Sequence, residues 1–317
     1  MLERSILIAI PTYNRSAIVE HLLIQISGII NATPNIYLGL YDSSDNNDTQ
    51  TVVEPFLSDS IRYKRYDAGL SEEKGYDILC NEGTKYDYIW FCSDRKVLRL
   101  GYLLPVIESD INSDADLIFF SCFGIEGSKK TITKRYEMGI QFFEVLNLAK
   151  SIIRSNVVMH MAKEDVYSKF IGSHFSIQAS LMDYIGCYDF KAVQFNLRDQ
   201  DVAVTGTIPF KHEWGDNVVW QWSKSWCDTV DKLPSSFNDY KEEIIRRNYM
   251  FTFRKVLARR ATGNEYVVSD IKEYERYIKR ITTSLVPFYV ARAIPTFALK
   301  YPYILYKKIK TITADNQ

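Results

Sequence analysis

The chain has 317 residues, and its 39 Lys and Arg are balanced by 39 Asp and Glu. This length allows one large domain with appendages or two modest domains, and it can bury a large core. Because the formal net charge is zero, no global field attracts nucleic acid, and attraction for an anionic partner has to be local.

The first 122 residues alternate apolar runs, which favour strands, with apolar residues at helical spacing. This alternation predicts an α/β fold with a parallel sheet, right-handed crossovers and flanking helices. We expect strands at 5–10, 35–41, 60–67, 88–92 and 115–122, and helices at 16–30, 50–57, 72–84 and 100–109.

The pattern becomes irregular after residue 123. We expect helices at 140–153 and 176–184, strand-like alternation at 193–208, and a charged, largely helical region at 240–277. The predicted organisation is a main domain at 1–230, with halves at 1–122 and 123–230, and a helical C-terminal extension at 231–317.

The five cysteines are scattered and form no C-x-x-C pair, which predicts reduced thiols rather than disulfides or a zinc site. The N-terminus shows no signal-peptide pattern, and no apolar run is long enough to span a bilayer. We therefore expect a cytoplasmic protein, free or peripheral on the inner face of the cell membrane.

Familiar nucleotide and hydrolase motifs are missing from the sequence. No G-x-G-x-x-G follows the first strand, and there is no G-x-x-x-x-G-K-[ST], which disfavours a dinucleotide oxidoreductase and a P-loop phosphotransferase. H-E-x-x-H and G-x-S-x-G are absent as well.

The aromatic strand expected at 88–92 stops abruptly at the polar sequence Ser93-Asp94-Arg95-Lys96. In an open α/β sheet, ligands bind outside the carboxyl ends of the strands, so these charges are well placed to meet a polar substrate. The ordinary alternative is a strand that leaves the core through a solvated turn.

Three segments, read together, resemble the family 2 glycosyltransferases of the GT-A fold, of the bacterial surface-polysaccharide type. They are Ile8-Ala9-Ile10-Pro11-Thr12-Tyr13-Asn14-Arg15, Leu40-Tyr41-Asp42-Ser43-Ser44-Asp45 with Thr49, and Tyr88-Ile89-Trp90-Phe91-Cys92-Ser93-Asp94. The resemblance covers the first third of the chain and rests on order and spacing. It implies a mostly parallel GT-A sheet, a nucleotide-sugar donor bound by residues 1–122, and an acceptor bound by residues 123–230.

The resemblance implies that residues at the strand ends bind a UDP-sugar. Asp42 would accept the imide N–H of uracil, which cytosine lacks, although a turn or helix-cap acid is the ordinary alternative. Lys74, after Gly69, would lie near the ribose and phosphates, or is simply a solvated helix charge. The full predicted set is Pro11, Thr12, Tyr13, Arg15, Asp42, Lys74, Asp94, Arg95 and Lys96.

The family's Asp-x-Asp, which holds a divalent cation, reads here as Asp94-Arg95-Lys96. We hypothesise that Lys96, with Arg95, supplies the charge that Mg²⁺ or Mn²⁺ provides elsewhere, so no metal-ligand set is predicted. Two alternatives stay open: Asp94 itself holds a metal as the last residue of Cys92-Ser93-Asp94, or the protein is a non-catalytic relative.

Inverting transfer needs a base near the acceptor hydroxyl, and no clear family signature identifies it. We rank His174 first, followed by Asp199 and Asp201, and then Asp165. Each has an ordinary alternative, because a lone His is more often structural and an exposed Asp is usually solvated.

Aromatic residues, including 22 Tyr and 17 Phe, suit carbohydrate or nucleobase sites and dense cores equally. The cluster Trp214, Trp220, Trp222 and Trp226 would form either an acceptor platform or a packed hinge. The segment 284–310 mixes aromatic and basic residues, as in a helix on anionic lipid, although Pro287, Pro295 and Pro302 interrupt it. An arm that packs on the domain or on a second subunit is the alternative.

The sequence thus predicts a hexosyltransferase that moves a sugar from a UDP-sugar to a saccharide or lipid-linked acceptor. Inversion without metal is the expected chemistry. The competing interpretation is a non-catalytic GT-A-like partner of another glycosyltransferase.

Overall fold

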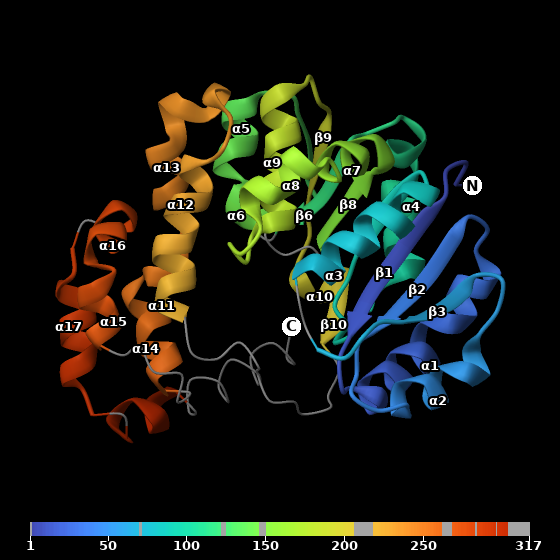
Figure 1. Ribbon diagram of the computed structural model, residues 1–317, viewed down its shortest axis with the longest axis horizontal. Coiled ribbons are helices and arrows are strands. Elements are labelled where there is room, and N and C mark those ends of the chain that lie inside the picture. Colours follow the sequence, from blue (N-terminus) through green and yellow to red (C-terminus); the bar gives the residue numbers. More distant parts are fainter. Residues whose placement is uncertain are drawn as a thin grey trace. The chain divides into compact units, whose positions relative to one another are not determined.

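The computed structural model describes residues 2–69, 72–121, 125–145, 150–205, 218–261, 268–282, 284–295 and 297–303 (Figure 1). The chain divides into two compact units. The first comprises Met1–Phe210 with Leu233–Asn238, and the second comprises Lys211–Lys232 with Asp239–Gln317.

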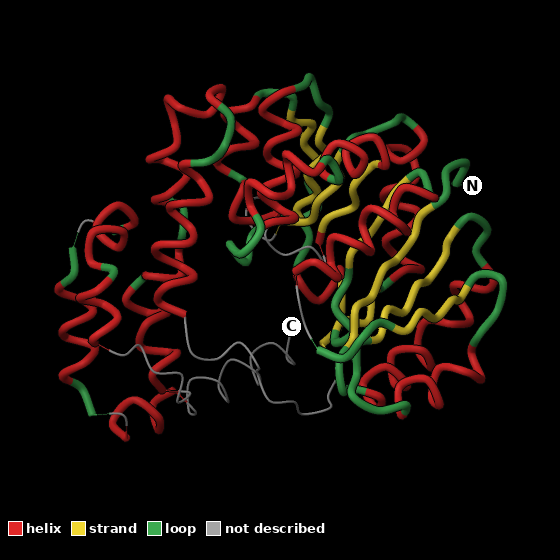
Figure 2. Tube along the Cα trace, in the orientation of Figure 1, coloured by secondary structure: helices red, strands yellow, loops and turns green. Residues whose placement is uncertain are grey.

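An eight-stranded mixed sheet forms the centre of the first unit, and its strands are yellow in Figure 2. The strand order is β3-β2-β1-β4-β8-β6-β9-β7. Its strands are β1 (Ile6–Thr12), β2 (Ile36–Asp42), β3 (Ile61–Arg65), β4 (Tyr88–Phe91), β6 (Leu117–Ser121), β7 (Lys129–Ile132), β8 (Ser151–Arg154) and β9 (Ala192–Asn196). Pairing is parallel except around β8 and at the edge strand β7. The predicted α/β class with a mostly parallel sheet is confirmed. A second, two-stranded sheet joins β5 (Lys96–Leu98) to β10 (Ala203–Thr205) in antiparallel pairing.

In the sequence, the α-helices of the first unit alternate with these strands. They are α1 (Ser16–Ala32), α2 (Asp48–Val53), α3 (Glu72–Asp77), α4 (Leu100–Asn112), α5 (Arg135–Ile140), α6 (Phe142–Val145), α7 (Ser155–Met161), α8 (Glu164–Phe170), α9 (Ser176–Cys187) and α10 (Asp199–Val202). A 3₁₀ turn, η1 (Glu54–Phe56), follows α2, and α3 continues as a π-helical turn, η2 (Ile78–Glu82), and a 3₁₀ turn, η3 (Gly83–Lys85).

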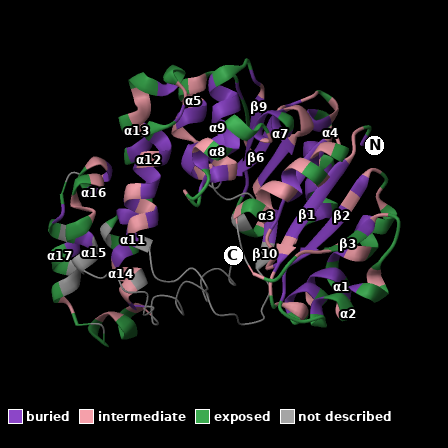
Figure 3. Ribbon diagram, viewed as in Figure 1, coloured by how far each residue is buried: buried purple, intermediate pink, exposed green. Residues whose placement is uncertain are grey.

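The period of two along the strands decides which face each helix covers. Ile8 of β1 and Trp90 of β4 are fully buried in one core with the apolar side of α1 and α4 (Figure 3). The alternate residues Ile89 and Phe91 face α3, η3, α7 and α9 instead, where Gly75 and Gly83 allow close approach. Each fully buried Ile or Leu contributes roughly 1.5–3 kcal/mol, so this double cover fixes the register of the central strands.

Three expected elements were wrong in detail. The helix expected at 140–153 is wrong at its end, where β8 forms. Ile152 and Ile153 pair with β4 on one side and with β6 on the other. A two-residue apolar run is compatible with a helix or a strand, so the sequence alone did not distinguish them. The strand expected at 193–208 is interrupted by α10, so Asp199 and Asp201 lie on a short helix. The helix expected at 50–57 changes to η1 where Pro55 occupies its first turn.

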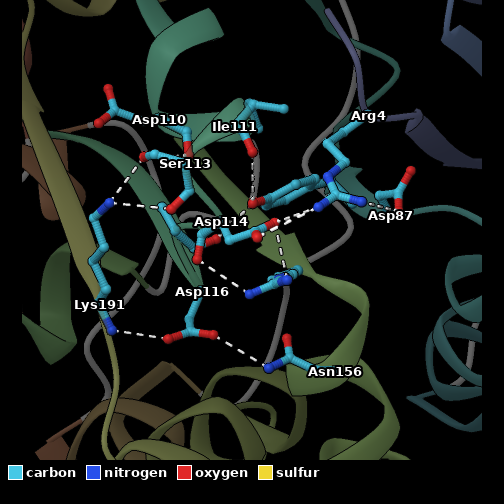
Figure 4. Close-up of polar contacts among 12 residues, drawn as sticks. Arg4, Asp87, Asp110, Ile111, Ser113, Asp114, Asp116, Asn156 and Lys191 are labelled. Atoms are coloured by element: carbon cyan, nitrogen blue, oxygen red, sulfur yellow. Dashed lines mark hydrogen bonds and ion pairs between the residues drawn. The ribbon is translucent and has the colours of Figure 1, made fainter.

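A charged network holds the amino ends of the strands, the edge opposite the carboxyl ends of β1, β2 and β4 (Figure 4). Asp114 accepts from Arg4 at 3.1 Å and from Arg154 at 2.9 Å. Asp116 accepts from the backbone N–H of Lys191 at 2.8 Å. Because Arg154 ends β8, these ion pairs hold the inserted antiparallel strand in the sheet.

The second unit is helical where it is described. Its elements are α11 (Val218–Trp220), η5 (Gln221–Ser225), α12 (Trp226–Asp231), η6 (Ser235–Tyr240, shared with the first unit), α13 (Lys241–Arg246), η7 (Tyr249–Phe251), α14 (Phe253–Ala261), α15 (Val268–Glu273), α16 (Glu275–Ile281) and α17 (Val286–Ala293). Trp226 is fully buried and donates its indole N–H to the Ile245 carbonyl at 3.2 Å, so it packs in this unit's core. Trp214 lies outside the described residues. No described helix combines the length and the apolar character needed to cross a membrane.

Candidate functional site

Thr12, the last residue of β1, lies at the centre of the candidate site. Strand β1 pairs with β2 on one side and with β4 on the other, and Thr12 is in register with Asp42. Its hydroxyl donates to Asp94 Oδ2 at 3.0 Å. The predicted residues Thr12, Asp42 and Asp94 therefore meet at the carboxyl ends of three adjacent strands, as expected for a ligand site in this class of sheet.

Asp94 follows β4 and is almost fully buried, with 2% of its surface exposed. Besides Thr12, its carboxylate accepts from Arg15 Nη1 at 3.2 and 3.3 Å. A buried carboxylate requires such compensation, because an unpaired charge would cost several kcal/mol. Arg15 precedes α1, so this ion pair joins the first loop to the end of β4.

Asp42 is fully buried and surrounded by donors. Its Oδ1 accepts from the backbone N–H and hydroxyl of Ser44, at 2.9 and 2.5 Å. Its Oδ2 accepts from the Tyr63 hydroxyl at 2.8 Å and from Arg65 Nη1 at 2.5 Å. These four contacts match the roughly four lone-pair sites of a carboxylate.

The loop after β1 and the turn after β2 are bound to each other. Asp45 accepts from the Tyr13 hydroxyl at 3.0 Å and from the Asn14 amide at 2.7 Å. These hydrogen bonds, that from Asn14 above all, hold the pKa of Asp45 below its usual value. Asn14 has a φ of 52°, in the left-handed region that Asn tolerates better than most residues. Tyr13 is thereby oriented beside the strand ends.

Lys74, in α3, binds the loop that precedes it. Its ammonium donates to the carbonyls of Asp67 and Gly69. Gly69 has a φ of +102°, where a side chain would be strained, and donates its N–H to the Ser43 carbonyl at 2.9 Å. Lys74 thus stabilises a turn that contacts the end of β2.

Arg95 and Lys96 continue from Asp94 into β5. Burial, and then the neighbouring Arg15, lower the pKa of Arg95, while Asp94 opposes this effect. Lys96 is in register with Thr205 of β10. The β5–β10 pair therefore brings a segment of the second half of the domain beside the Asp94 turn.

The candidates for the base lie in different surroundings. His174 is half exposed and has its Nδ1 4.0 Å from Glu72 Oε1 of α3, and Glu72 Oε2 accepts the Gly172 N–H at 2.9 Å. Asp201 accepts from Arg198 Nε at 2.8 Å on α10, directly before β10. Asp199 opens α10, and nothing further of its side chain is described. Asp165 is exposed in the first turn of α8, an ordinary place for an acid.

The sequence interpretation overlooked four residues that complete the site: Ser44, Tyr63, Arg65 and Glu72. Tyr63 and Arg65 alternate on the β3 face that is in register with Leu40 and Asp42, and this period-two signal could have identified them. The contact of Glu72 with the 172–174 loop joins segments 100 residues apart and has no local signal.

The residues present do not fit a divalent cation at Asp94. Its carboxylate already accepts from Thr12 and Arg15, and the ammonium of Lys96 cannot ligate a metal. Within the described ranges of the chain, no three His, Cys, Asp or Glu side chains gather to form a metal site.

No protein-family profile and no curated protein matches the chain. Solved structures do. S. aureus TarS 1–349 in complex with UDP-GlcNAc has a TM-score of 0.60 and 13% identity, over 96% of this chain and 92% of that one. The same part of TarS in complex with UDP has a TM-score of 0.55 and 13% sequence identity. The match covers 96% of this chain and 91% of that one. The longer S. aureus TarS chain has a TM-score of 0.55 and 12% sequence identity, and the match covers 93% of this chain and 54% of that one.

Identities this low establish a shared fold. The eight-stranded mixed sheet agrees with the mostly parallel sheet that the resemblance implies. The chain therefore has the GT-A glycosyltransferase fold.

Proposed function

We propose that the protein transfers a sugar from a UDP-sugar donor to a saccharide hydroxyl, with inversion, in the synthesis of a surface polysaccharide. The observation that carries this proposal is the meeting of Thr12, Asp42 and Asp94 at three adjacent strand ends. Support also comes from the fold shared with TarS, whose structure was solved with UDP-GlcNAc.

Uracil is bound between Tyr13 and Asp42 in this proposal. For Asp42 to accept the imide N–H, one of its four donors has to turn away. The Ser44 hydroxyl suits this role, because it lies 3.2 Å from Thr49 Oγ1 and has an alternative partner there. Pro11 and Thr12 fix the backbone at the end of β1, and Lys74 supports the turn at Gly69 near the ribose.

The diphosphate is bound by the cations around Asp94. Arg15, Arg95 and Lys96 come from two segments that meet at Asp94, so three cationic side chains belong to this end of the sheet. Their positive charge stabilises the leaving nucleoside diphosphate as its bond to the sugar breaks.

His174 is the proposed base. The acceptor oxygen attacks the anomeric carbon, its proton passes to the imidazole, and the bond to the β-phosphate oxygen of UDP breaks, which releases UDP. Glu72, at 4.0 Å, stabilises the imidazolium that forms. Asp201 and Asp199 precede β10 and are the next candidates.

The acceptor is proposed to be lipid-linked, with the C-terminal segment on the inner face of an anionic membrane. Val286, Phe297 and Tyr301 are 64, 70 and 75% exposed. The sequence from 285 to 314 has five basic residues and no acid, the composition of an interfacial segment. A Phe297→Asp, Tyr301→Asp double variant should sediment less with phosphatidylglycerol vesicles, whereas Ile24→Asp, at an exposed position of α1, should not. Equal sedimentation of both variants would contradict the lipid contact.

The purified protein tests the enzymatic proposal directly. We expect it to release UDP from a UDP-sugar in the presence of EDTA, slowly by hydrolysis and faster with a saccharide acceptor. An intact donor in every condition would instead indicate a non-catalytic partner of another transferase. Release that stops with EDTA and returns with Mn²⁺ would contradict the role proposed for Lys96.

A further inference from the structure

One face of the outer strands β2 and β3 carries tyrosines and charged residues. Leu38 and Leu40 belong to the core on the α1 side. Because side chains alternate along a strand, Gly39 and Tyr41 belong to the opposite face, in register with Arg62 and Lys64 of β3. This face is separate from Asp42, which shares the side of Leu40.

A cavity of about 240 Å³ opens on this face. Its volume is below the roughly 300–1,000 Å³ of pockets for drug-sized ligands, so it suits one small ring and excludes a nucleotide. Its lining includes Gly39, Tyr41, Arg62, Lys64, Glu82 and Tyr86.

Glycine at position 39 gives the cavity its aromatic wall. A Cβ there would come within 2.5 Å of the Tyr41 hydroxyl oxygen and 2.7 Å of its ring, so only glycine lets this ring lie against β2. The Tyr86 ring is fixed by Tyr37, with their centroids 5.0 Å apart. The cavity thus has two rings held in place.

The polar groups of the cavity are partly unused. Tyr41 is only 5% exposed, and its hydroxyl makes no hydrogen bond with any residue of the described chain. Arg62 is exposed and likewise makes no hydrogen bond or ion pair within the described ranges. Lys64 is paired with Glu82 at 3.2 Å.

We propose that this cavity binds one sugar unit. The flat apolar face of a pyranose packs on tyrosine rings, and its hydroxyls pair with the Tyr41 hydroxyl, the Arg62 guanidinium and the Glu82 carboxylate. The choice of a sugar rests on the proposed transferase function, since the acceptor is a saccharide. The site is distinct from the strand ends that bind the donor, and it would hold a unit of the acceptor chain away from the reacting hydroxyl.

Saturation-transfer NMR on the full-length protein, saturated with UDP, tests this proposal. The probes are methyl glycosides of glucose, galactose, N-acetylglucosamine and glucuronic acid, and a tetrasaccharide of whichever sugar binds. At least one glycoside should bind, and the tetrasaccharide should bind more tightly if the natural ligand is a chain rather than a free sugar.

Two conservative variants connect binding to the cavity. Tyr41→Phe keeps the ring and removes the hydroxyl, and Arg62→Gln removes the free charge at an exposed position that folding tolerates. Each should weaken binding roughly three- to ten-fold, the value of one hydrogen bond. Arg246→Gln, at an exposed and unpaired position among the described residues of α13, should leave binding unchanged.

Binding that is absent, or unchanged in both variants, would overturn the sugar site. The protein could instead bind inorganic phosphate and no glycoside, with Arg62→Gln abolishing the phosphate binding. This result would show that the cavity binds an anion, and it would also overturn the sugar site. UDP titration separates the two proposals. If the protein binds UDP but no glycoside, the proposed function stands and the sugar site is wrong. If it binds a glycoside but not UDP, only the proposed donor site is wrong.

Discussion

Thr12 and Asp94, 82 residues apart in the sequence, are joined by a 3.0 Å hydrogen bond between Oγ1 and Oδ2, and both side chains are almost fully buried. This bond ties the end of β1 to the turn after β4. It is also the point where the first loop, through Arg15, balances the buried carboxylate. The geometry of these strand ends therefore depends in part on Thr12.

Replacing Thr12 by Val keeps the shape of the side chain and removes the donor. We expect the free energy of unfolding to fall by about 1–3 kcal/mol, because Asp94 Oδ2 loses a buried partner. Urea unfolding followed by circular dichroism measures this change. Thr51→Val, on the exposed side of α2, is the control, and equal effects of the two variants would deny Thr12 its structural role.

Asp42→Asn removes the charge that Arg65 and Tyr63 bind. We expect a loss of roughly 2 kcal/mol or more of stability, less than for a wholly buried pair because Arg65 is 31% exposed. We also expect weaker discrimination between UDP and CDP, measured by calorimetric titration of each nucleotide. Asp59→Asn, exposed and unpaired in the described chain, should change neither quantity, and unaltered selectivity in Asp42→Asn would remove Asp42 from base recognition.

His174→Ala should lower kcat by about 10²–10⁴-fold, the usual contribution of a general base, with little change in the binding of UDP. Glu72→Gln should cause a smaller loss of kcat, since Glu72 acts through the imidazole. The control is His21→Ala on α1. Unchanged turnover in His174→Ala would transfer the proposal to Asp201 or Asp199.

High pH should destabilise the protein. Burial raises the pKa of Cys227 to about 12, and burial with the Asp77 hydrogen bond raises that of Tyr66 to about 12. Both groups hold their protons more tightly in the folded state than in the unfolded chain. Their contribution to the free energy of unfolding is therefore complete below the pKa values that they have in the unfolded chain. It is lost as pH rises through about 9 to 12.

Urea unfolding at several alkaline pH values measures how steeply the free energy of unfolding falls as the pH rises. Tyr66→Phe should flatten this slope, because phenylalanine does not titrate. A free energy of unfolding that stays constant over this range, or an unchanged slope in Tyr66→Phe, would contradict the assignment.

The sequence was most informative where local pattern and topology agree. The apolar runs of β1, β2 and β4 end in polar residues, so the position of Thr12, Asp42 and Asp94 at strand ends followed from the sequence. That β1 pairs with both β2 and β4 is known from the structure. The partners of these residues did not follow. That Arg15 binds Asp94, and that Lys74 binds its own loop, depends on side-chain geometry that spacing does not specify.

Long-range pairing accounts for the other differences. Strand β8 exists because two neighbouring strands accept Ile152 and Ile153, and nothing within that short segment distinguishes it from a helix. The contact of Glu72 with the loop at Gly172 is likewise a product of the tertiary fold.

Calorimetric titration of UDP in the presence of EDTA is the most direct test of the central proposal, that the ends of β1, β2 and β4 bind a uridine diphosphate. We expect that UDP binds, that CDP binds more weakly, and that Arg95→Gln and Lys96→Gln each weaken UDP binding about ten-fold or more, as expected for the loss of a charged contact. No binding of UDP, or affinities that neither substitution changes, would contradict it.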